Sequence, residues 1–559
     1  MPNSTPFIQV IVPLRLEWEP YYRLEEGVTA AVGDRMTVIL SGRRYTAVVS
    51  AVNVTPPPDI TKILTARPAP LPGISPEEIS FMRELAGYYL CTVGEVYKAA
   101  YPSLTHHQSK LPLPEELAPL DAPALSPARK TALEEVQKGL AGGKTVLLEA
   151  APAAGTELFL SLAVDCLRKG KSALYLVPEI GSSSQLEAHI RETIPSAILY
   201  HSGLSPAKRK LVAEILRTGN PHLVLGTRSS LFLPFRNLGL VMVADEQDTS
   251  YKQDSPAPRY HAREASILLA RAHGAQVVLA SATPSLESVY NADTGLFAGV
   301  CLKEDFPTRR TELVNTAAEI RKNGMSGSFS LKLLTELHSC LDAGQKALLV
   351  CRSKAAIPDC TAELEEIFGP GNHGIELTTP ATFKLQPLGI FGLVGVLHAD
   401  FILAREDFRC DERAMQALSQ LQARCIPGGL LMIQTFEPGH PAFGSWNRET
   451  VDRLLAERRQ FGYPPYTRLV QVVIRDSAEK RLQFMSRELV RALQGVLPAG
   501  VGVIGPYPAS DETDVRLIRI TLPRNKSLLP SKRLIYSTVS SFEKDQKYLT
   551  HIHLDVDPL

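Results

Sequence analysis

Six short apolar runs, separated by segments long enough to form helices, mark the middle of the chain. They are VLLEA, ALYLV, AILYH, HLVLG, LVMVAD and VVLASA, all between residues 146 and 282. This alternation is typical of a parallel sheet with helices on both faces. The pattern therefore predicts an α/β lobe over residues 125–305. A second α/β lobe is predicted over residues 306–446, where the apolar run ALLVC precedes the helical segment AELEEIFG.

The two ends of the chain have different patterns. Residues 1–104 contain the runs FIQVIVPL, RMTVIL and YTAVVSAV, which predict a small β domain, followed by a predicted helix from Ile79 to Ala99. Residues 105–124 are rich in proline and lack periodicity, so we interpret them as a linker. Residues 447–559 contain four strand-like runs and a predicted helix from Glu479 to Leu497, which indicates an α+β domain. The fold class predicted for the whole chain is multidomain α/β.

Composition narrows the classes of function. The 559 residues are 44% hydrophobic and 21% charged, as in an ordinary globular protein. Because the net charge is only +1, a nucleic-acid surface would have to come from local basic patches. No secretion signal or apolar run of about 18 residues is found, so we expect a cytoplasmic protein without a membrane partner. The eight cysteines form no Cys-x-x-Cys pair, and we therefore expect reduced thiols and no zinc or other metal site.

An acidic cluster follows the most apolar of the central runs. Asp245, Glu246 and Asp248 come directly after the run Leu240–Val243, at the C-terminal end of the predicted strand. Open parallel sheets build their ligand crevices at that end, so the cluster indicates chemistry on a bound ligand. A solvated acidic turn after a core strand is an equally simple interpretation. The segments SYKQ and PRYHAR follow within 20 residues.

These segments, in this order, resemble the primosomal replication-restart helicase family PriA (primosomal protein N′). The same resemblance is carried by HSGLS, GTRSSLFLPF, SATPSLESVYNA and DFRCDERAMQALSQLQAR, which follow the family order and spacing. It spans almost the whole chain, apart from a winged-helix domain and a zinc-binding insertion that have no counterpart here. The resemblance implies two RecA-like parallel-sheet helicase lobes, an N-terminal domain that binds DNA 3′ ends and a C-terminal α+β domain.

The nucleotide motifs of this family are altered in this chain. Where the family has Gly-Ser-Gly-Lys-Thr-Glu, the chain has Pro-Ala-Ala-Gly-Thr-Glu, so Gly155 replaces the lysine that reaches the phosphates and Thr156 is kept. Where the family has Asp-Glu-Glu-His, the chain has Ala-Asp-Glu-Gln, which leaves Asp245 at the catalytic glutamate position and keeps Glu246. Pro427 stands where the family supplies an arginine finger.

Other nucleotide-side positions differ as well. Arg129 takes the place of the glutamine that reads adenine, and the motif TTPATFKL keeps only Thr379 and Lys384 of the family pattern. We therefore expect a degenerate remnant of a nucleotide site, no catalytic residue and no cofactor. ATP and Mg²⁺ would be expected only if the motor were active after all.

The resemblance also assigns candidate DNA-binding residues. Thr227 and Arg228 suit phosphate oxygens, and the PRYHAR segment offers cations and rings for base stacking. Each of these turns could instead be structural, and a lone surface lysine is common. The full set of candidates is Gly42, Lys62, Thr227, Arg228, Arg259, Tyr260, His261 and Arg263.

Three functional hypotheses remain open from the sequence. The first is a DNA-binding protein of replication restart and primosome assembly at forked DNA, without ATPase or unwinding activity. The second is an active ATP-dependent 3′-5′ DNA helicase, and the third is an interaction module that no longer binds DNA. Expected partners are forked or single-stranded DNA, with single-strand-binding protein and helicase-loading proteins as further candidates. Basic residues of the C-terminal domain that could contact them are Arg516, Arg519, Arg524, Lys526 and Lys532.

Overall fold

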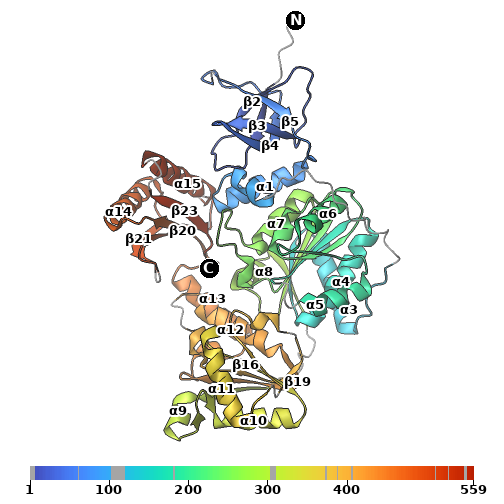
Figure 1. Cartoon of the computed structure of the whole chain (residues 1–559), viewed down its shortest axis with the longest axis vertical. Helices are drawn as coiled ribbons and strands as arrows, with labels where there is room; N and C mark the ends of the chain where they lie inside the picture. Colours follow the sequence, from blue (N-terminus) through green and yellow to red (C-terminus); the bar gives the residue numbers. More distant parts are fainter. Residues whose placement is uncertain are drawn as a thin grey trace.

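The chain folds into a β-barrel, two α/β lobes and an α+β domain (Figure 1). The computed structural model describes residues 7–60, 62–101, 120–179, 183–302, 310–371, 374–386, 388–403, 407–509, 512–526, 528–546 and 550–558. The predicted fold class is confirmed: the chain forms a small N-terminal β domain, two parallel-sheet lobes and a C-terminal α+β domain. Most of the predicted linker, residues 105–124, lies outside the described residues.

The N-terminal barrel buries one side of each alternating strand. Its strands are β1 (Phe7–Ile11), β2 (Tyr21–Leu24), β3 (Arg35–Leu40), β4 (Arg43–Val52) and β5 (Thr65–Pro68), closed in the order β1-β2-β5-β3-β4. Ile8, Val10, Met36 and Val38 point into its core, as period-two alternation requires. The turn between β3 and β4 contains Gly42 at φ 77°, a conformation that favours glycine.

Two helices follow the barrel, α1 (Pro76–Tyr89) and α2 (Val93–Ala100). The prediction of one helix from Ile79 to Ala99 is wrong. Leu90 adopts the left-handed conformation at φ 55° and ends α1. Thr92 then starts α2 with a capping box: its side chain accepts from the Glu95 N–H, and the Glu95 carboxylate accepts from the Thr92 N–H.

The central lobe, lobe 1, contains a seven-stranded parallel sheet in the order β12-β6-β11-β10-β7-β9-β8. Its strands are β6 (Thr145–Glu149), β7 (Ser172–Leu176), β8 (Ile198–Tyr200), β9 (Leu223–Gly226), β10 (Leu238–Ala244), β11 (Gln276–Ser281) and β12 (Phe297–Cys301). The helices are α3 (Pro127–Ala141), α4 (Pro152–Arg168), α5 (Ser183–Thr193), α6 (Pro206–Arg217), α7 (Ala262–His273) and α8 (Leu286–Asp293). Two separate hydrophobic clusters flank the sheet, which explains why its strands are apolar on both sides.

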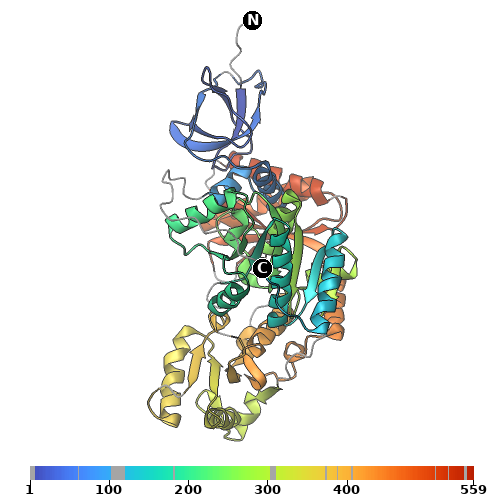
Figure 2. The same cartoon turned by 90° about the vertical axis from the view of Figure 1, so that its right-hand side faces the viewer.

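The second lobe, lobe 2, has a five-stranded parallel sheet in the order β13-β19-β18-β16-β17. Its strands are β13 (Arg310–Asn315), β16 (Lys346–Val350), β17 (Ile375–Thr378), β18 (Phe391–Val396) and β19 (Cys425–Thr435). Its larger helices are α10 (Leu331–Asp342), α11 (Ile357–Phe368) and α12 (Cys410–Gln422). Turning the molecule by 90° shows the barrel, lobe 1 and lobe 2 following one another along the long axis (Figure 2).

Helix α13 (Arg448–Gln460) leads into the C-terminal domain. Its antiparallel sheet has the order β21-β22-β20-β23. The strands are β20 (Thr467–Arg475), β21 (Gly502–Pro508), β22 (Val515–Pro523) and β23 (His551–Val556), and the helices are α14 (Glu479–Val496) and α15 (Leu528–Asp545).

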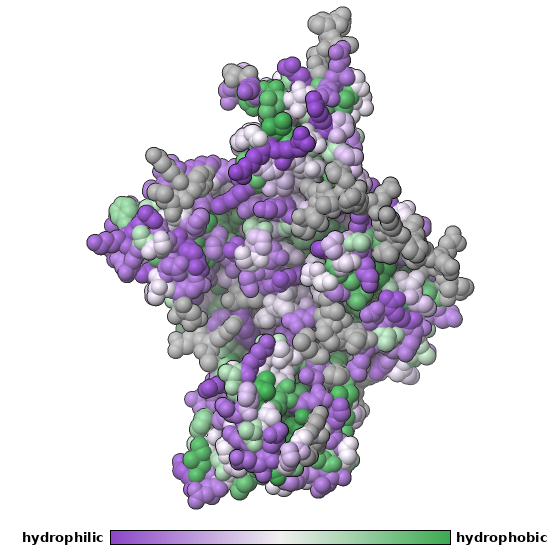
Figure 3. Space-filling view, viewed as in Figure 1, coloured by the Kyte–Doolittle hydropathy of each residue, from purple (hydrophilic) through white to green (hydrophobic). Residues whose placement is uncertain are grey.

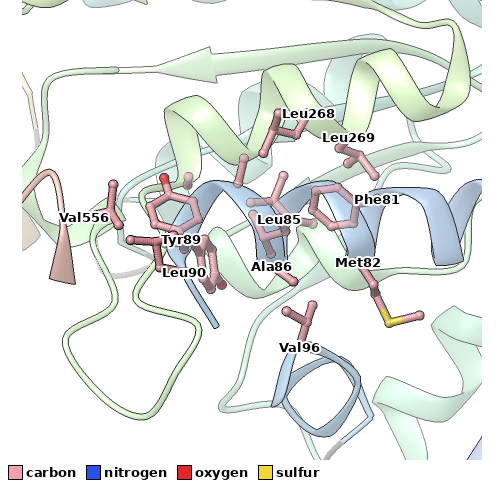
Figure 4. Packing of buried hydrophobic residues seen from close by; sticks show 14 of the residues in the cluster. Phe81, Met82, Leu85, Ala86, Tyr89, Leu90, Val96, Leu268, Leu269 and Val556 are labelled. Atoms are coloured by element: carbon pink, nitrogen blue, oxygen red, sulfur yellow. The ribbon is translucent and has the colours of Figure 1, made fainter. Parts of the chain in front are cut away.

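Helix α1 joins three parts of the molecule. Phe81 and Leu85 of α1 pack with Leu268 and Leu269 of α7, and Val556 of β23 belongs to the same cluster (Figure 4). The barrel, lobe 1 and the C-terminal domain therefore meet in one apolar junction. The face drawn in Figure 3 is largely hydrophilic, with small apolar patches scattered over it. Within the described ranges, no helix is long and apolar enough to cross a membrane.

Candidate functional site

A cavity of 150 Å³ lies between the two lobes. Lobe 1 contributes the segments that follow β6, β10 and β11, so the cavity sits at the carboxyl ends of the parallel strands, where such folds bind ligands. Lobe 2 contributes the end of α12 and the segment around Lys384. The predicted remnant residues Gly155, Thr156 and Asp245 all line the cavity.

The connection between β6 and α4 is very short. Strand β6 ends at Glu149 and α4 starts at Pro152, so Ala150 and Ala151 alone connect them. Pro152 has no N–H, and the Gly155 N–H donates to the Ala151 carbonyl at 2.9 Å as part of the helix. This turn therefore leaves few backbone donors that could face an anion.

The Thr156 hydroxyl is engaged within the protein. It donates to the Pro152 carbonyl at 3.0 Å and lies 3.2 Å from the Tyr175 hydroxyl. Arg129, from α3, pairs with Glu157 of α4. Polar groups on this side of the cavity thus already have protein partners.

Asp245 is partly buried at the end of β10, in the left-handed conformation at φ 46°. Burial raises its pKa to about 6, the nearby Asp248 adds to the rise, and Arg424 and Lys384 oppose it. Gln247 is buried as well, and its Oε1 has no hydrogen-bond partner among the described residues. This wall of the cavity therefore presents one unsatisfied acceptor, the Gln247 Oε1, beside an Asp245 carboxyl group that is hydrogen-bonded to the Gln247 side chain.

Glu246 points away from the cavity and holds lobe 1 together. It is 0% exposed and accepts from the Ser285 N–H at 2.6 Å, from the Ser285 and Ser288 hydroxyls at 3.0 Å, and from Arg263 at 3.0 Å. Its carboxylate thus ties the end of β10 to α7 and α8. Although predicted as part of the nucleotide remnant, Glu246 does not line the cavity.

The lobes contact each other beside the cavity. Lys384 of lobe 2 pairs with Asp248 of lobe 1 at 2.7 Å. Burial alone would raise the pKa of Asp248, but the Lys384 ammonium outweighs it, so the pKa of Asp248 is lowered. Arg424 donates to the carbonyls of Phe383 at 3.0 Å and Lys384 at 3.1 Å, so it is engaged within lobe 2.

A second set of contacts joins the lobes through α12 and α13. Glu412 accepts from the Leu286 N–H at 2.9 Å and pairs with Arg458 of α13. Glu287 pairs with Arg409 at 3.2 Å and with Arg458 at 3.4 Å. Burial of Glu287 is outweighed by these two guanidinium groups, which lower its pKa.

The structure places most of the PRYHAR segment inside the protein. Tyr260 is 1% exposed, its hydroxyl donates to the Arg228 carbonyl at 3.3 Å, and its ring meets Phe232 edge-on with centroids 5.4 Å apart. In this structure the Tyr260 ring belongs to the core and is not exposed for the stacking on a DNA base that the sequence predicts. His261 is 8% exposed and caps α7 by accepting from the Arg263 N–H.

Arg263 is likewise engaged within lobe 1. It pairs with Glu246 at 3.0 Å and Glu264 at 2.7 Å, and although burial opposes it, these carboxylates raise its pKa. The His261 side chain is buried, the Arg263 side chain is 12% exposed, and both hold α7 in place, so the DNA contacts expected of them stay predictions.

Arg228 and Thr227 lie at the end of β9 and are partly buried. The Arg228 guanidinium donates to the carbonyls of Ser250 at 2.9 Å and Lys252 at 2.5 Å, so it braces the loop after β10. The Thr227 hydroxyl lies 3.5 Å from that of Ser229. Arg228 and Tyr260 thus lie together around a packed loop.

Lys252 was missed as a key residue by the sequence reasoning. Its side chain is 1% exposed, and its ammonium pairs with Asp555 at 2.7 Å and donates to the carbonyls of Val556 at 2.8 Å and Asp557 at 3.3 Å. Lobe 1 is thereby fastened to β23 of the C-terminal domain. The SYKQ segment was the available signal, but its partners lie about 300 positions away in the chain.

The remaining predicted DNA-binding residues are Gly42, Lys62 and Arg259. Gly42 and Lys62 are exposed on the barrel, in the β3–β4 turn and between β4 and β5. Arg259 is partly exposed at a cavity of 200 Å³ shared with Arg15 and His553. No group of three or more potential metal ligands is found within the described part of the chain.

Comparison with protein-family profiles finds two matches. Residues 9–102 match a profile described as "3'DNA-binding domain (3'BD)" of PriA, and residues 459–559 match "Primosomal protein N C-terminal domain". The first covers the barrel with α1 and α2, and the second covers the end of α13 and the C-terminal domain.

Similar proteins carry the same family name. The chain is 26% identical to the "Replication restart protein PriA" of Synechocystis sp. over 78% of this chain and 65% of that protein, so it spans less than two thirds of that relative. The protein of the same name from Rickettsia conorii is 25% identical, over 98% of this chain and 99% of its own length. A solved structure of the DUF1998 helicase MrfA matches 69% of this chain and 58% of its own, at 14% identity and a TM-score of 0.35.

Proposed function

We propose, on the premise that this chain belongs to the PriA family of replication restart proteins, that it binds forked or single-stranded DNA without hydrolysing ATP. In this proposal the protein serves replication restart and primosome assembly in the cytoplasm as a DNA-binding scaffold. The proposal rests mainly on the connection between β6 and α4, which consists of Ala150 and Ala151 only. At the same time, both terminal domains match the family profiles.

The absence of ATP hydrolysis is supported by the interlobe cavity. ATP requires donors for its phosphates and a carboxylate for Mg²⁺, but here Pro152 and Gly155 lie in the first turn of α4 and Ala244 takes the position before Asp245. Pro427 lies exposed in β19 and offers no cation for the transferred phosphoryl group. The residues present therefore do not fit a bound Mg–ATP.

DNA binding is supported by the barrel. Its exposed basic side chains include Lys62, Arg43 and Arg44, and the last two directly follow the turn at Gly42. With a net charge of +1, such a local patch is what DNA binding requires. Arg259 adds a partly exposed cation at the edge of lobe 1 and forms no ion pair within the described residues.

A protein partner is supported by a groove at the junction of α1, α7 and α15. This cavity of 650 Å³ combines Arg533, an exposed cation with no ion pair among the described residues, with the apolar Leu529, which is 65% exposed. Arg83 and Arg271 also line it but pair with Glu19 and Glu84, and the buried Lys532 donates to the Tyr88 carbonyl. Such a lining suits an acidic segment with apolar side chains, and single-strand-binding protein is the candidate carried over from the family resemblance. Among the C-terminal basic residues named from the sequence, Lys532 alone lines this groove.

The proposal is tested by measuring fork binding and phosphate release on the same preparation. We expect binding to a fork with a recessed 3′ end at low salt, and no ATP hydrolysis above background with or without that DNA. Gly155→Lys should not restore hydrolysis, because an arginine finger alone is worth about 10³ to 10⁵ in rate and Pro427 remains. Elemental analysis should find no stoichiometric zinc.

The alternative, an active 3′-5′ helicase, predicts the opposite result. DNA-stimulated hydrolysis that Asp245→Asn abolishes would establish the alternative and overturn the proposal. Failure of the wild-type protein to bind either DNA at low salt would leave the interaction-module hypothesis in its place.

A further inference from the structure

The interlobe cavity has an acceptor that no residue satisfies. Gln247 is 8% exposed, it lines the cavity, and its Oε1 lacks a hydrogen-bond partner among the described residues. Buried carbonyl oxygens are nearly always paired, because leaving one unpaired is costly. A donor from outside the chain would satisfy Gln247, and the Asp245 carboxyl group on the same wall is a second acceptor.

The cations near the cavity are already used. Lys384 pairs with Asp248, which also accepts from Gln420 at 3.3 Å. Arg424 donates to backbone carbonyls of lobe 2. A ligand in the cavity therefore meets acceptors and carboxyl groups but few free donors.

The rest of the lining is apolar and aromatic. Phe159 and Tyr175 stand edge to face with ring centroids 5.1 Å apart, and Val177 and Leu186 lie beside them on the lining. The volume of 150 Å³ is below the range of about 300 to 1,000 Å³ that is usual for drug-sized ligands. The cavity thus fits a single small ring compound.

We propose that this cavity binds a small, uncharged nitrogen heterocycle whose N–H groups donate to Gln247 and Asp245, and that it excludes phosphorylated nucleotides. Phosphate groups would meet the carboxyl groups of Asp245 and Asp248, and Lys384 and Arg424, the cations on the lining, are already engaged. The inference shares with the proposed function the loss of a phosphate cradle, but it does not depend on DNA binding.

The test is a calorimetric titration of the full chain without DNA, using adenine, unsubstituted purine, AMP and ATP as probes. We expect adenine to bind, and purine, which lacks the amino donors, to bind about five- to tenfold more weakly, as loss of one hydrogen bond predicts. ATP should bind at least about tenfold more weakly than adenine. Binding of ATP as tight as that of adenine, or no adenine binding at millimolar concentration, would overturn the inference.

Two variants locate the bound probe. Gly155→Leu should abolish adenine binding, because a Cβ at Gly155 has no atom within 4 Å and the new side chain can enter the cavity without a clash. Gly495→Leu in α14 is the matched control, since that glycine is also helical and unhindered but lies outside the cavity. Gln247→Leu should weaken adenine about five- to tenfold.

The variants also separate this inference from the proposed function. Unchanged adenine binding by Gly155→Leu would place the probe elsewhere and contradict the inference. Fork binding and phosphate release, measured on the wild type alone, decide the proposed function whatever the result with adenine.

Discussion

The segment after β10 faces two very different surroundings. On one side, Asp245 and Gln247 line the interlobe cavity, where Asp245 has a raised pKa and Gln247 an unpaired oxygen. On the other side, Lys252 and Tyr260 are buried with partners in the C-terminal domain and in lobe 1. The residues that line the cavity differ from the family motif, whereas the SYKQ and PRYHAR segments, which contain Lys252 and Tyr260, match it.

This difference changes how the retained motifs are interpreted. The segments GTRSSLFLPF, SYKQ and PRYHAR resemble the family, but their central side chains brace the loop after β10 and fasten it to β23. Packing within the protein is thus a sufficient physical reason for Arg228, Tyr260 and Arg263. The exposed barrel residues and Arg259 are the better candidates for contact with DNA.

The largest effect is expected from Lys252→Met. The substitution leaves Asp555 and the Val556 carbonyl without their buried cation, and breaking a buried pair costs about 3 to 5 kcal/mol. Urea unfolding should show this loss of stability, with earlier proteolysis at the C-terminal domain. Lys480→Met, at an exposed position of α14, is the matched control and should change stability by less than about 0.5 kcal/mol.

Substitutions of Tyr260 test whether its ring packs in the core or contacts DNA. Tyr260→Ala should destabilise the fold by about 3 kcal/mol or more, because it opens a cavity in the core. Tyr260→Phe, which loses only the bond to Arg228, should cost about 0.5 to 1.5 kcal/mol. Fork affinity of Tyr260→Phe should equal that of the wild type. A folded Tyr260→Ala protein with normal stability and lost DNA affinity would favour base stacking instead.

Asp245→Asn should stabilise the protein, and the gain should depend on pH. The pKa of Asp245 in the folded state, about 6, exceeds its ordinary value of 3.8, so the folded state binds the carboxyl proton more tightly than the unfolded state. The stability of the wild type therefore falls as the pH rises from about 4 through 6. Two pKa units correspond to about 3 kcal/mol, an upper limit for the gain at pH 8. At pH 4 the variant and the wild type should be nearly equal in urea unfolding. An equal gain at both pH values would contradict the raised pKa.

Much of the fold could be predicted from the sequence because its strands are buried on both faces. Runs such as Leu240–Val243 have one interpretation in an α/β context, and the acidic cluster was placed correctly at the end of that strand. The break between α1 and α2 was missed, since Leu90 carries no sequence signal for a left-handed conformation. The capping residues Thr92 and Glu95 did carry one.

The site was harder to predict because burial depends on distant segments. Nothing within PRYHAR tells whether Tyr260 faces solvent or the core; Phe232 and the Arg228 carbonyl decide it. In the same way, Glu246 was grouped with Asp245 from the family motif, although Asp245 takes a left-handed turn directly after β10 and the two side chains have different surroundings. One of them lines the cavity, and the other pairs with Ser285.

The smallest expected effect belongs to Lys62→Ala on the barrel. Lys62 is exposed and carries no ion pair in the described structure, so its loss should leave stability unchanged. If its ammonium contacts one phosphate near a recessed 3′ end, fork affinity should fall by a few fold and the slope of log affinity against log salt should become shallower by less than about one unit. Binding to plain single strands should hardly change.

Lys98→Ala, an exposed lysine on α2, is the matched control. Equal losses for both variants would indicate general charge attraction, whereas a loss confined to Lys62 and to recessed ends would assign DNA contact to the barrel, the region where packing does not already explain the side chain.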